Sequence, residues 1–242
     1  MNSLNVHIAS KRYGCGPCTM QDLRVSARPG ELLALVGPSG AGKTTLLKII
    51  SGLDTAFEGR AQVPPATCTS LMFQEPRLMP WLSVAQNLQL VAPDVEMPQI
   101  VAALQRVDLQ DCAALYPRQL SGGMQRRVAL LRAFLTQPQL LLMDEPFASL
   151  DHPTAELLRG QLLSLWQVHK PTVLMVTHSL SEALALADRV LFLSTGPARI
   201  ALDYSVPVAR PRGLDSAEVQ ALSQALLRQH PDLLKGRLVT LA

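Results

Sequence analysis

The chain has 242 residues, of which 48% are hydrophobic, and its formal net charge is +3. This length and composition can bury a large core, and alternating strand-like and helix-like segments predict an α/β fold. The charge is mild, and no run of lysines and arginines is long enough to indicate a nucleic-acid partner, so we expect none, although the charge itself says little about partners. Neither a signal-peptide pattern nor a stretch of about eighteen apolar residues occurs, so we expect another polypeptide to supply any membrane path.

Near the N-terminus, Cys15 and Cys18 enclose Gly-Pro, which is the tetrapeptide of thioredoxin-like enzymes. Those enzymes place it between a strand and a helix whose N-terminus lowers the thiol pKa. Here the pattern predicts a polar hairpin between two early strands. A redox function is therefore the less favoured alternative, and we expect all four cysteines to stay reduced.

Residues 37–44 read GPSGAGKT and fit the phosphate-loop pattern G-x-x-x-x-G-K-[ST]. The apolar residues 32–36 predict a buried strand before the loop, and residues 45–50 predict a helix after it. Glycines let backbone N–H groups and the helix N-terminus face phosphates. Lys43 can then reach the β and γ phosphates, and the Thr44 hydroxyl can bind Mg²⁺.

A second anion-binding element is predicted at residues 120–124, which read LSGGM before a predicted helix at 125–135. A serine followed by two glycines indicates a helix N-cap whose N–H groups face outward. Alone, such a pattern is more often an ordinary cap. Because the phosphate loop already covers one side of a nucleotide, this element predicts closure over ATP from outside.

The apolar residues 140–143 predict a buried strand that ends in two acids. Asp144 would hold the Mg²⁺ shell, and Glu145 would polarise the attacking water. A solvated acidic turn is the alternative, which the upstream phosphate loop disfavours.

Another predicted strand, at residues 173–176, precedes His178. Ser179 and Glu182 predict a capping box at the next helix, which leaves His178 free for a nucleotide. We expect the remaining histidines, at positions 7, 152, 169 and 230, to face solvent without partners.

The last predicted helix spans residues 216–229 and carries Val219, Leu222 and Leu226 at helical spacing. We expect it to pack on the body of the protein. A membrane-surface or partner helix is the alternative, which its lone basic residue, Arg228, disfavours.

These motifs resemble the ATP-binding cassette family, the nucleotide-binding subunits of ABC transporters, over nearly the whole chain. The resemblance implies an α/β P-loop NTPase core with a small antiparallel β-subdomain and an inserted α-helical subdomain. It implies an ATPase domain at residues 1–210, with the helical subdomain at about 75–135, and a C-terminal helical tail at 211–242.

The resemblance also implies roles for single residues. Tyr13 stands where an aromatic ring stacks on adenine, Gln74 where a glutamine joins the Mg²⁺ and water shell, and His178 where a switch histidine contacts the γ-phosphate. Asp151 stands in the D-loop that crosses the dimer. The expected catalytic residues are Lys43, Gln74, Glu145 and His178, and the expected metal ligands are Thr44, Gln74 and Asp144. The expected ATP-binding residues are Tyr13, Gly37, Pro38, Ser39, Gly40, Ala41, Gly42, Lys43, Thr44, Thr45, Gln74, Ser121, Gly122, Gly123, Asp151 and His178.

The segment after Gln74, EPRLMPWLSV, resembles the Q-loop of nitrate, sulfonate and taurine importers. LSGGM, DEPFASLD and residues 196–200 and 207–212 resemble the same class. Trp81 is the candidate contact for a coupling helix of the membrane subunit, with core packing as the alternative.

The resemblance therefore implies a homodimeric ATPase that uses ATP and Mg²⁺ to drive import through a separate permease, with an extracytoplasmic binding protein. It implies a peripheral position at the cytoplasmic face of the inner membrane. An exporter or lipid-extraction ATPase shares every catalytic motif, and a soluble cassette ATPase acting on DNA or ribosomes is the third alternative. The transported molecule stays open.

Overall fold

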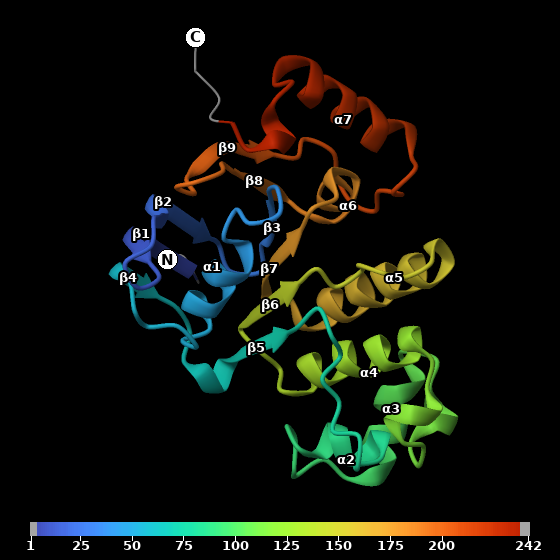
Figure 1. Cartoon of the computed structure of the whole chain (residues 1–242). Helices are drawn as coiled ribbons and strands as arrows, with labels where there is room; N and C mark the ends of the chain where they lie inside the picture. Colours follow the sequence, from blue (N-terminus) through green and yellow to red (C-terminus); the bar gives the residue numbers. More distant parts are fainter. Residues whose placement is uncertain (1–3, 238–242) are drawn as a thin grey trace.

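The computed structural model describes residues 4–237, in which the strands form two sheets (Figure 1). An antiparallel sheet has the order β2-β1-β4, and a six-stranded sheet has the order β5-β6-β7-β3-β8-β9 and is parallel except at β9. The strands are β1 Leu4–Arg12, β2 Cys18–Ala27, β3 Leu32–Val36, β4 Glu58–Gln62, β5 Thr69–Met72, β6 Leu140–Asp144, β7 Thr172–Thr177, β8 Arg189–Leu193 and β9 Ile200–Ser205.

Helices connect the strands and cover both faces of the larger sheet (Figure 1). The α-helices are α1 Lys43–Ile50, α2 Val84–Gln89, α3 Met97–Gln105, α4 Gly122–Leu135, α5 His152–His169, α6 Leu180–Leu186 and α7 Ala217–Gln229. Short 3-10 helices are η1 Ala66–Cys68, η2 Gln110–Cys112, η3 Pro117–Gln119 and η4 Leu233–Lys235. No helix among these residues is both long and apolar enough to cross a bilayer.

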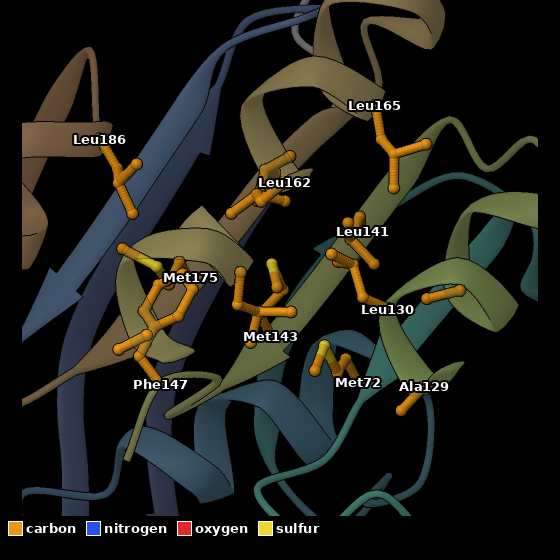
Figure 2. Close-up of a cluster of buried hydrophobic side chains, with 14 of the residues drawn as sticks. Met72, Ala129, Leu130, Leu141, Met143, Phe147, Leu162, Leu165, Met175 and Leu186 are labelled. Atoms are coloured by element: carbon orange, nitrogen blue, oxygen red, sulfur yellow. The ribbon is translucent and has the colours of Figure 1, made fainter. Parts of the chain in front are cut away.

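The hydrophobic core lies on both faces of the larger sheet, as the side chains of strand β6 show. Successive side chains of a strand point to opposite faces of the sheet. Leu140 and Leu142 pack in a core with α1, whereas Leu141 and Met143 pack with α4 and α5 (Figure 2). Helix α1 and the pair α4 and α5 therefore lie on opposite faces.

The carboxyl ends of β3, β5, β6 and β7 meet at one edge, because these strands are parallel. In register, Met72 pairs with Met143, and Asp144 pairs with Val176. The segments that leave these strands carry the phosphate loop, Gln74, Glu145 and His178. Ligands of open α/β sheets bind at such an edge.

The α/β expectation is confirmed, and so is the packing of the last predicted helix. Val219 and Leu226 of α7 are 0% and 2% exposed, and α7 packs on α6. The cysteine tetrapeptide lies at the connection between β1 and β2, as expected, with Cys18 as the first residue of β2, and Cys15 and Cys18 are free thiols. The boundary between a domain ending at 210 and a separate tail stays a prediction.

Candidate active site

The phosphate loop, residues 37–44, leaves β3 and runs into α1. Gly40 and Gly42 have φ angles of +79° and +85°, which residues with a Cβ rarely adopt. A Cβ on Gly42 would also lie 2.9 Å from the methyl carbon of Met20 on β2. The loop therefore needs glycine at both positions to take this shape.

Lys43 begins α1, and its side chain folds back across the loop. The ammonium donates hydrogen bonds to the backbone oxygens of Gly37 at 2.7 Å and Pro38 at 3.0 Å. Burial lowers the pKa of Lys43, whereas the charges of Glu145 and Asp144 act to raise it. A buried ammonium hydrogen-bonded to neutral carbonyls fits a phosphate oxygen, which would supply the opposite charge.

The side-chain oxygens of Thr44 and Asp144 lie side by side. The Thr44 hydroxyl donates to Asp144 Oδ2 at 3.0 Å. Burial raises the pKa of Asp144, and the hydrogen bond from Thr44 opposes that shift. A hydroxyl beside a carboxylate matches the ligands that Mg²⁺ prefers. Within residues 4–237 no group of three or more His, Cys, Asp or Glu side chains could hold a metal ion.

Glu145 and His178 form a pair across β6 and β7. His178 Nδ1 lies 3.2 Å from Glu145 Oε2. Glu145 has a φ of +43°, and its backbone N–H donates to the oxygen of Val176 at 2.9 Å. The carboxylate is 22% exposed and the imidazole 64%. A carboxylate held by a turn and paired with an imidazole is suited to accept a proton from water.

Gln74 and Tyr13 flank this group. Gln74 is exposed and follows β5, which lies beside β6 in the sheet. Tyr13 is 52% exposed, and its hydroxyl oxygen lies 3.2 Å from Thr45 Oγ1, within hydrogen-bond distance. Tyr13 is thereby tied to α1, directly beside the phosphate loop. A contact of Gln74 with Mg²⁺ or water stays a prediction.

The signature segment, residues 120–124, is not brought to this group. It starts helix α4, on the opposite face of the sheet from α1 (Figure 1). Ser121 caps α4 by accepting from the N–H of Met124 at 3.2 Å. Asp151 caps the neighbouring helix α5 by accepting from the N–H of Thr154 at 3.0 Å. Ser121, Gly122, Gly123 and Asp151 thus form a second group within the same chain.

Two contacts of helix α4 with neighbouring segments were not predicted from the sequence. A Cβ on Gly123 would lie 2.5 Å from the methyl carbon of Thr154. The buried Arg126 donates to the backbone oxygen of Pro146 at 2.8 Å, directly after Glu145. A glycine inside a helix, where alanine is intrinsically better, signals the first contact. An arginine within an apolar helix face signals the second.

The expectation that the other histidines lack partners is wrong for three of them. The His169 ring lies against the Phe134 ring, with the two centroids 6.1 Å apart. His7 Nε2 lies 2.9 Å from Asp22 Oδ1, and His152 Nε2 lies 3.2 Å from Asp215 Oδ2. Both carboxylates are distant in sequence, so local pattern could not reveal them.

The expected capping box is half formed. Ser179 accepts from the N–H of Glu182 at 3.3 Å. The Glu182 carboxylate accepts instead from the Thr177 hydroxyl at 2.7 Å, and Thr177 Oγ1 accepts from the N–H of Ser179. None of these hydrogen bonds involves the His178 side chain, which contacts Glu145, and its contact with a nucleotide stays a prediction.

Comparison with known proteins places these features in a family. The ABC transporter model matches residues 20–148. The aliphatic sulfonates import ATP-binding protein SsuB 1 of Pseudomonas fluorescens is 44% identical over 218 residues, which cover 90% of this chain and 83% of that protein. SsuB of Bacillus subtilis is 39% identical over 220 residues, which cover 87% of this chain and 86% of that protein.

A solved dimer of an ATP-binding cassette, in a post-hydrolysis state with ADP and phosphate, is 25% identical with a TM-score of 0.74. The match covers 86% of this chain and 100% of that one. Motifs, fold and relatives agree, and the chain belongs to the ABC transporter family.

Proposed function

We propose that this chain is the ATP-hydrolysing subunit of an importer for small sulfonates or related anions, and that two copies work together on a separate permease. The observation that carries the ATPase part is the convergence of Lys43, the Thr44–Asp144 pair and the Glu145–His178 pair at one sheet edge. Import and the sulfonate class are supported by the names of the relatives, which match over most of their length.

The need for two copies follows from the position of the signature segment. A Cβ added to Gly122 would meet no heavy atom within 4 Å, so the start of α4 is open to a ligand. A helix start favours phosphate through its unpaired N–H groups and its dipole. Because α4 and α1 lie on opposite faces, the signature of one copy would meet the phosphate loop of the other.

Each site residue then has a separate role in binding or hydrolysing ATP. Lys43 leaves its carbonyl partners for the β and γ phosphates, and Tyr13 offers its exposed ring to adenine. Glu145 accepts a proton from the attacking water, while His178 orients the carboxylate and contacts the γ-phosphate side. Gln74 joins the water shell from the end of β5. These assignments are part of the proposal.

Mg²⁺ would be held by Thr44 and Asp144, with Gln74 as a further ligand. When bound, the ion would neutralise charge on the β and γ phosphates. The close Thr44–Asp144 contact, and the burial that disfavours an isolated Asp144 carboxylate, both fit a cation at this position.

Permease docking is assigned to the segment after Gln74. Trp81 is 71% exposed, so the alternative that it packs in the core is wrong. Tryptophan is enriched among the residues that carry most of the binding energy of protein interfaces. Leu90, at the end of α2, is also 57% exposed. We propose these residues as the contact for a membrane subunit, at the cytoplasmic face of the inner membrane.

An extracytoplasmic binding protein would deliver the transported substrate, as the resemblance to this class of importers implies. The test is to tag the chain in its native cell, solubilise the membranes and identify copurifying proteins by mass spectrometry. We expect a multispanning permease, and uptake of a labelled alkanesulfonate that is lost with Lys43→Ala. Recovery with ribosomal or DNA-bound proteins and no permease would reject the importer assignment.

A further inference from the structure

Below the Tyr13 ring lies a lysine that the proposed chemistry does not use. Lys11 is 2% exposed, and its Nζ lies 4.5 Å from the centroid of the Tyr13 ring. The ammonium donates to Asp54 Oδ1 at 2.7 Å and to the backbone oxygen of Ala56 at 2.7 Å. A buried charge must be paired and hydrogen-bonded, as Lys11 is, and even then the pair often stabilises a fold no more than apolar residues of similar volume would. This ion pair therefore suggests a role other than stability.

Asp54 connects the lysine to the tyrosine a second time. Its Oδ2 accepts from the Tyr13 hydroxyl at 3.2 Å, while its Oδ1 accepts from Lys11 and from the N–H of Ala56. The hydrogen bond from Lys11 lowers the pKa of Asp54, which keeps the carboxylate charged. The same hydroxyl also contacts Thr45. The ring is therefore held at one face by Lys11 and at its hydroxyl by Asp54 and Thr45.

This arrangement leaves the ring with two different faces. One face is occupied by the Lys11 ammonium, while the side chain as a whole stays 52% exposed. A cation attracts the π-electrons of a ring from one face. The opposite face is then poorer in electrons, and stacks better on an electron-rich ring such as adenine.

We propose that Lys11 and Asp54 are positioning residues for the nucleotide base, which act through Tyr13. They hold the ring beside the phosphate loop with one face free. This inference rests on the proposed function, in which Tyr13 stacks on adenine. It goes further, because part of the affinity for the base would come from the Lys11–Asp54 ion pair, which would not itself touch the nucleotide.

The test compares two ligands that differ in the nucleoside. Binding of ADP and of pyrophosphate to the purified full chain is measured by calorimetry, with Mg²⁺ present. We expect Lys11→Met to weaken ADP binding by about 3- to 30-fold, which is the range of a cation–π contact. Pyrophosphate binding should change less than about twofold, because the phosphate loop is untouched.

A double-mutant cycle separates positioning from general damage. In a Tyr13→Leu background, Lys11→Met should have no further effect on ADP binding, because the ring through which it acts is gone. Arg24→Met, which removes an exposed ion pair with Asp22 on β2, is the matched control and should leave both affinities unchanged.

Lys11→Met leaves Asp54 without its cation, so Lys11→Met/Asp54→Asn is measured as well; it removes both charges at similar volume. We expect the same selective loss of ADP affinity. If both variants bind ADP like wild type while Tyr13→Leu does not, the inference is overturned and the proposed base site stands. If Tyr13→Leu also binds ADP like wild type, both the proposed stacking of adenine on Tyr13 and this inference are contradicted.

Discussion

The two groups of site residues in this chain are built in opposite ways. The phosphate-loop group contains a buried ammonium with a lowered pKa, a carboxylate with a raised pKa and a Glu145 backbone at positive φ. The signature group contains helix caps, Ser121 on α4 and Asp151 on α5, with satisfied hydrogen bonds. The first group costs folding free energy in the absence of ligand, whereas the second contributes to it.

This difference shows how one fold can carry half a site on each of two surfaces. The phosphate-loop group needs a polyanion and a cation to balance its charges. The signature group needs nothing to fold and offers N–H groups that a second copy can use. Substitutions in the first group should therefore change chemistry and stability in opposite directions.

Glu145→Gln should have the largest effect. Replacing the proton-accepting carboxylate is expected to lower the ATPase rate by about 10²- to 10⁴-fold while ATP still binds. Without hydrolysis the closed dimer should accumulate, which size-exclusion chromatography with ATP can detect. Glu156→Gln, on the exposed side of α5, is the control. A Glu145→Gln protein with wild-type turnover would remove Glu145 from catalysis.

Gly122→Asp tests the signature group without harming the fold. An acid in the first turn of a helix stabilises it by about 0.3–1 kcal/mol, so Tm should not fall. Facing a nucleotide held by another copy, the same carboxylate would repel the phosphates and reduce ATPase activity by roughly tenfold or more. Gly122→Ala, which also meets no atom within 4 Å, should keep activity. Full activity in Gly122→Asp would contradict a nucleotide at this helix start.

Gly123→Ala should instead destabilise the protein. The new methyl would overlap the Thr154 methyl carbon, at 2.5 Å, and overpacking costs about 1–3 kcal/mol. Thr154→Ser removes that methyl and keeps the hydroxyl that donates to Asp151 Oδ2 at 2.8 Å. We therefore expect the double variant to regain most of the loss in denaturant unfolding. If Gly123→Ala is as stable as Gly122→Ala, the close packing against Thr154 is wrong.

Asp144→Asn should give the smallest effect on the stability of the ligand-free protein. Burial raises the pKa of Asp144, so its carboxylate weakens the ligand-free fold as pH rises through that pKa, and the loss is absent at lower pH. Asparagine stays neutral. The Tm advantage of the variant should thus appear at neutral pH and shrink toward acid pH, and saturating Mg²⁺ and ATP should abolish it. An advantage that is equal at all pH values would contradict the assigned cause.

Much of the fold was predictable because its signals are local. The apolar residues 32–36 form β3 as expected, and the acid pair stands at the end of β6, with Asp144 as its last residue. Glycines, capping residues and buried strand runs act within a few residues of where they stand. Hence the phosphate loop, Asp144, Glu145 and the start of α4 could be located from the amino-acid sequence alone.

The supporting contacts were not predictable, because they join distant segments. Lys11 meets Asp54 over 43 positions of sequence, and Arg126 reaches the turn after β6. The chain after α7 returns to the phosphate loop, where a Cβ on Gly236 would lie 2.9 Å from the Pro38 ring. Such pairs depend on how α-helices and strands pack, which no local pattern of this single sequence specifies.

The most direct test of the two-copy site mixes two impaired proteins. Lys43→Ala and Gly122→Asp chains are purified, their low ATPase rates are measured separately, and the two are combined. A site shared between copies predicts recovery of activity, because one of the two sites in a mixed dimer has an intact phosphate loop and an intact signature. Lys43→Ala mixed with Lys43→Ala/Gly122→Asp, which has no intact phosphate loop, should stay inactive. A first mixture as inactive as its components would contradict the shared site.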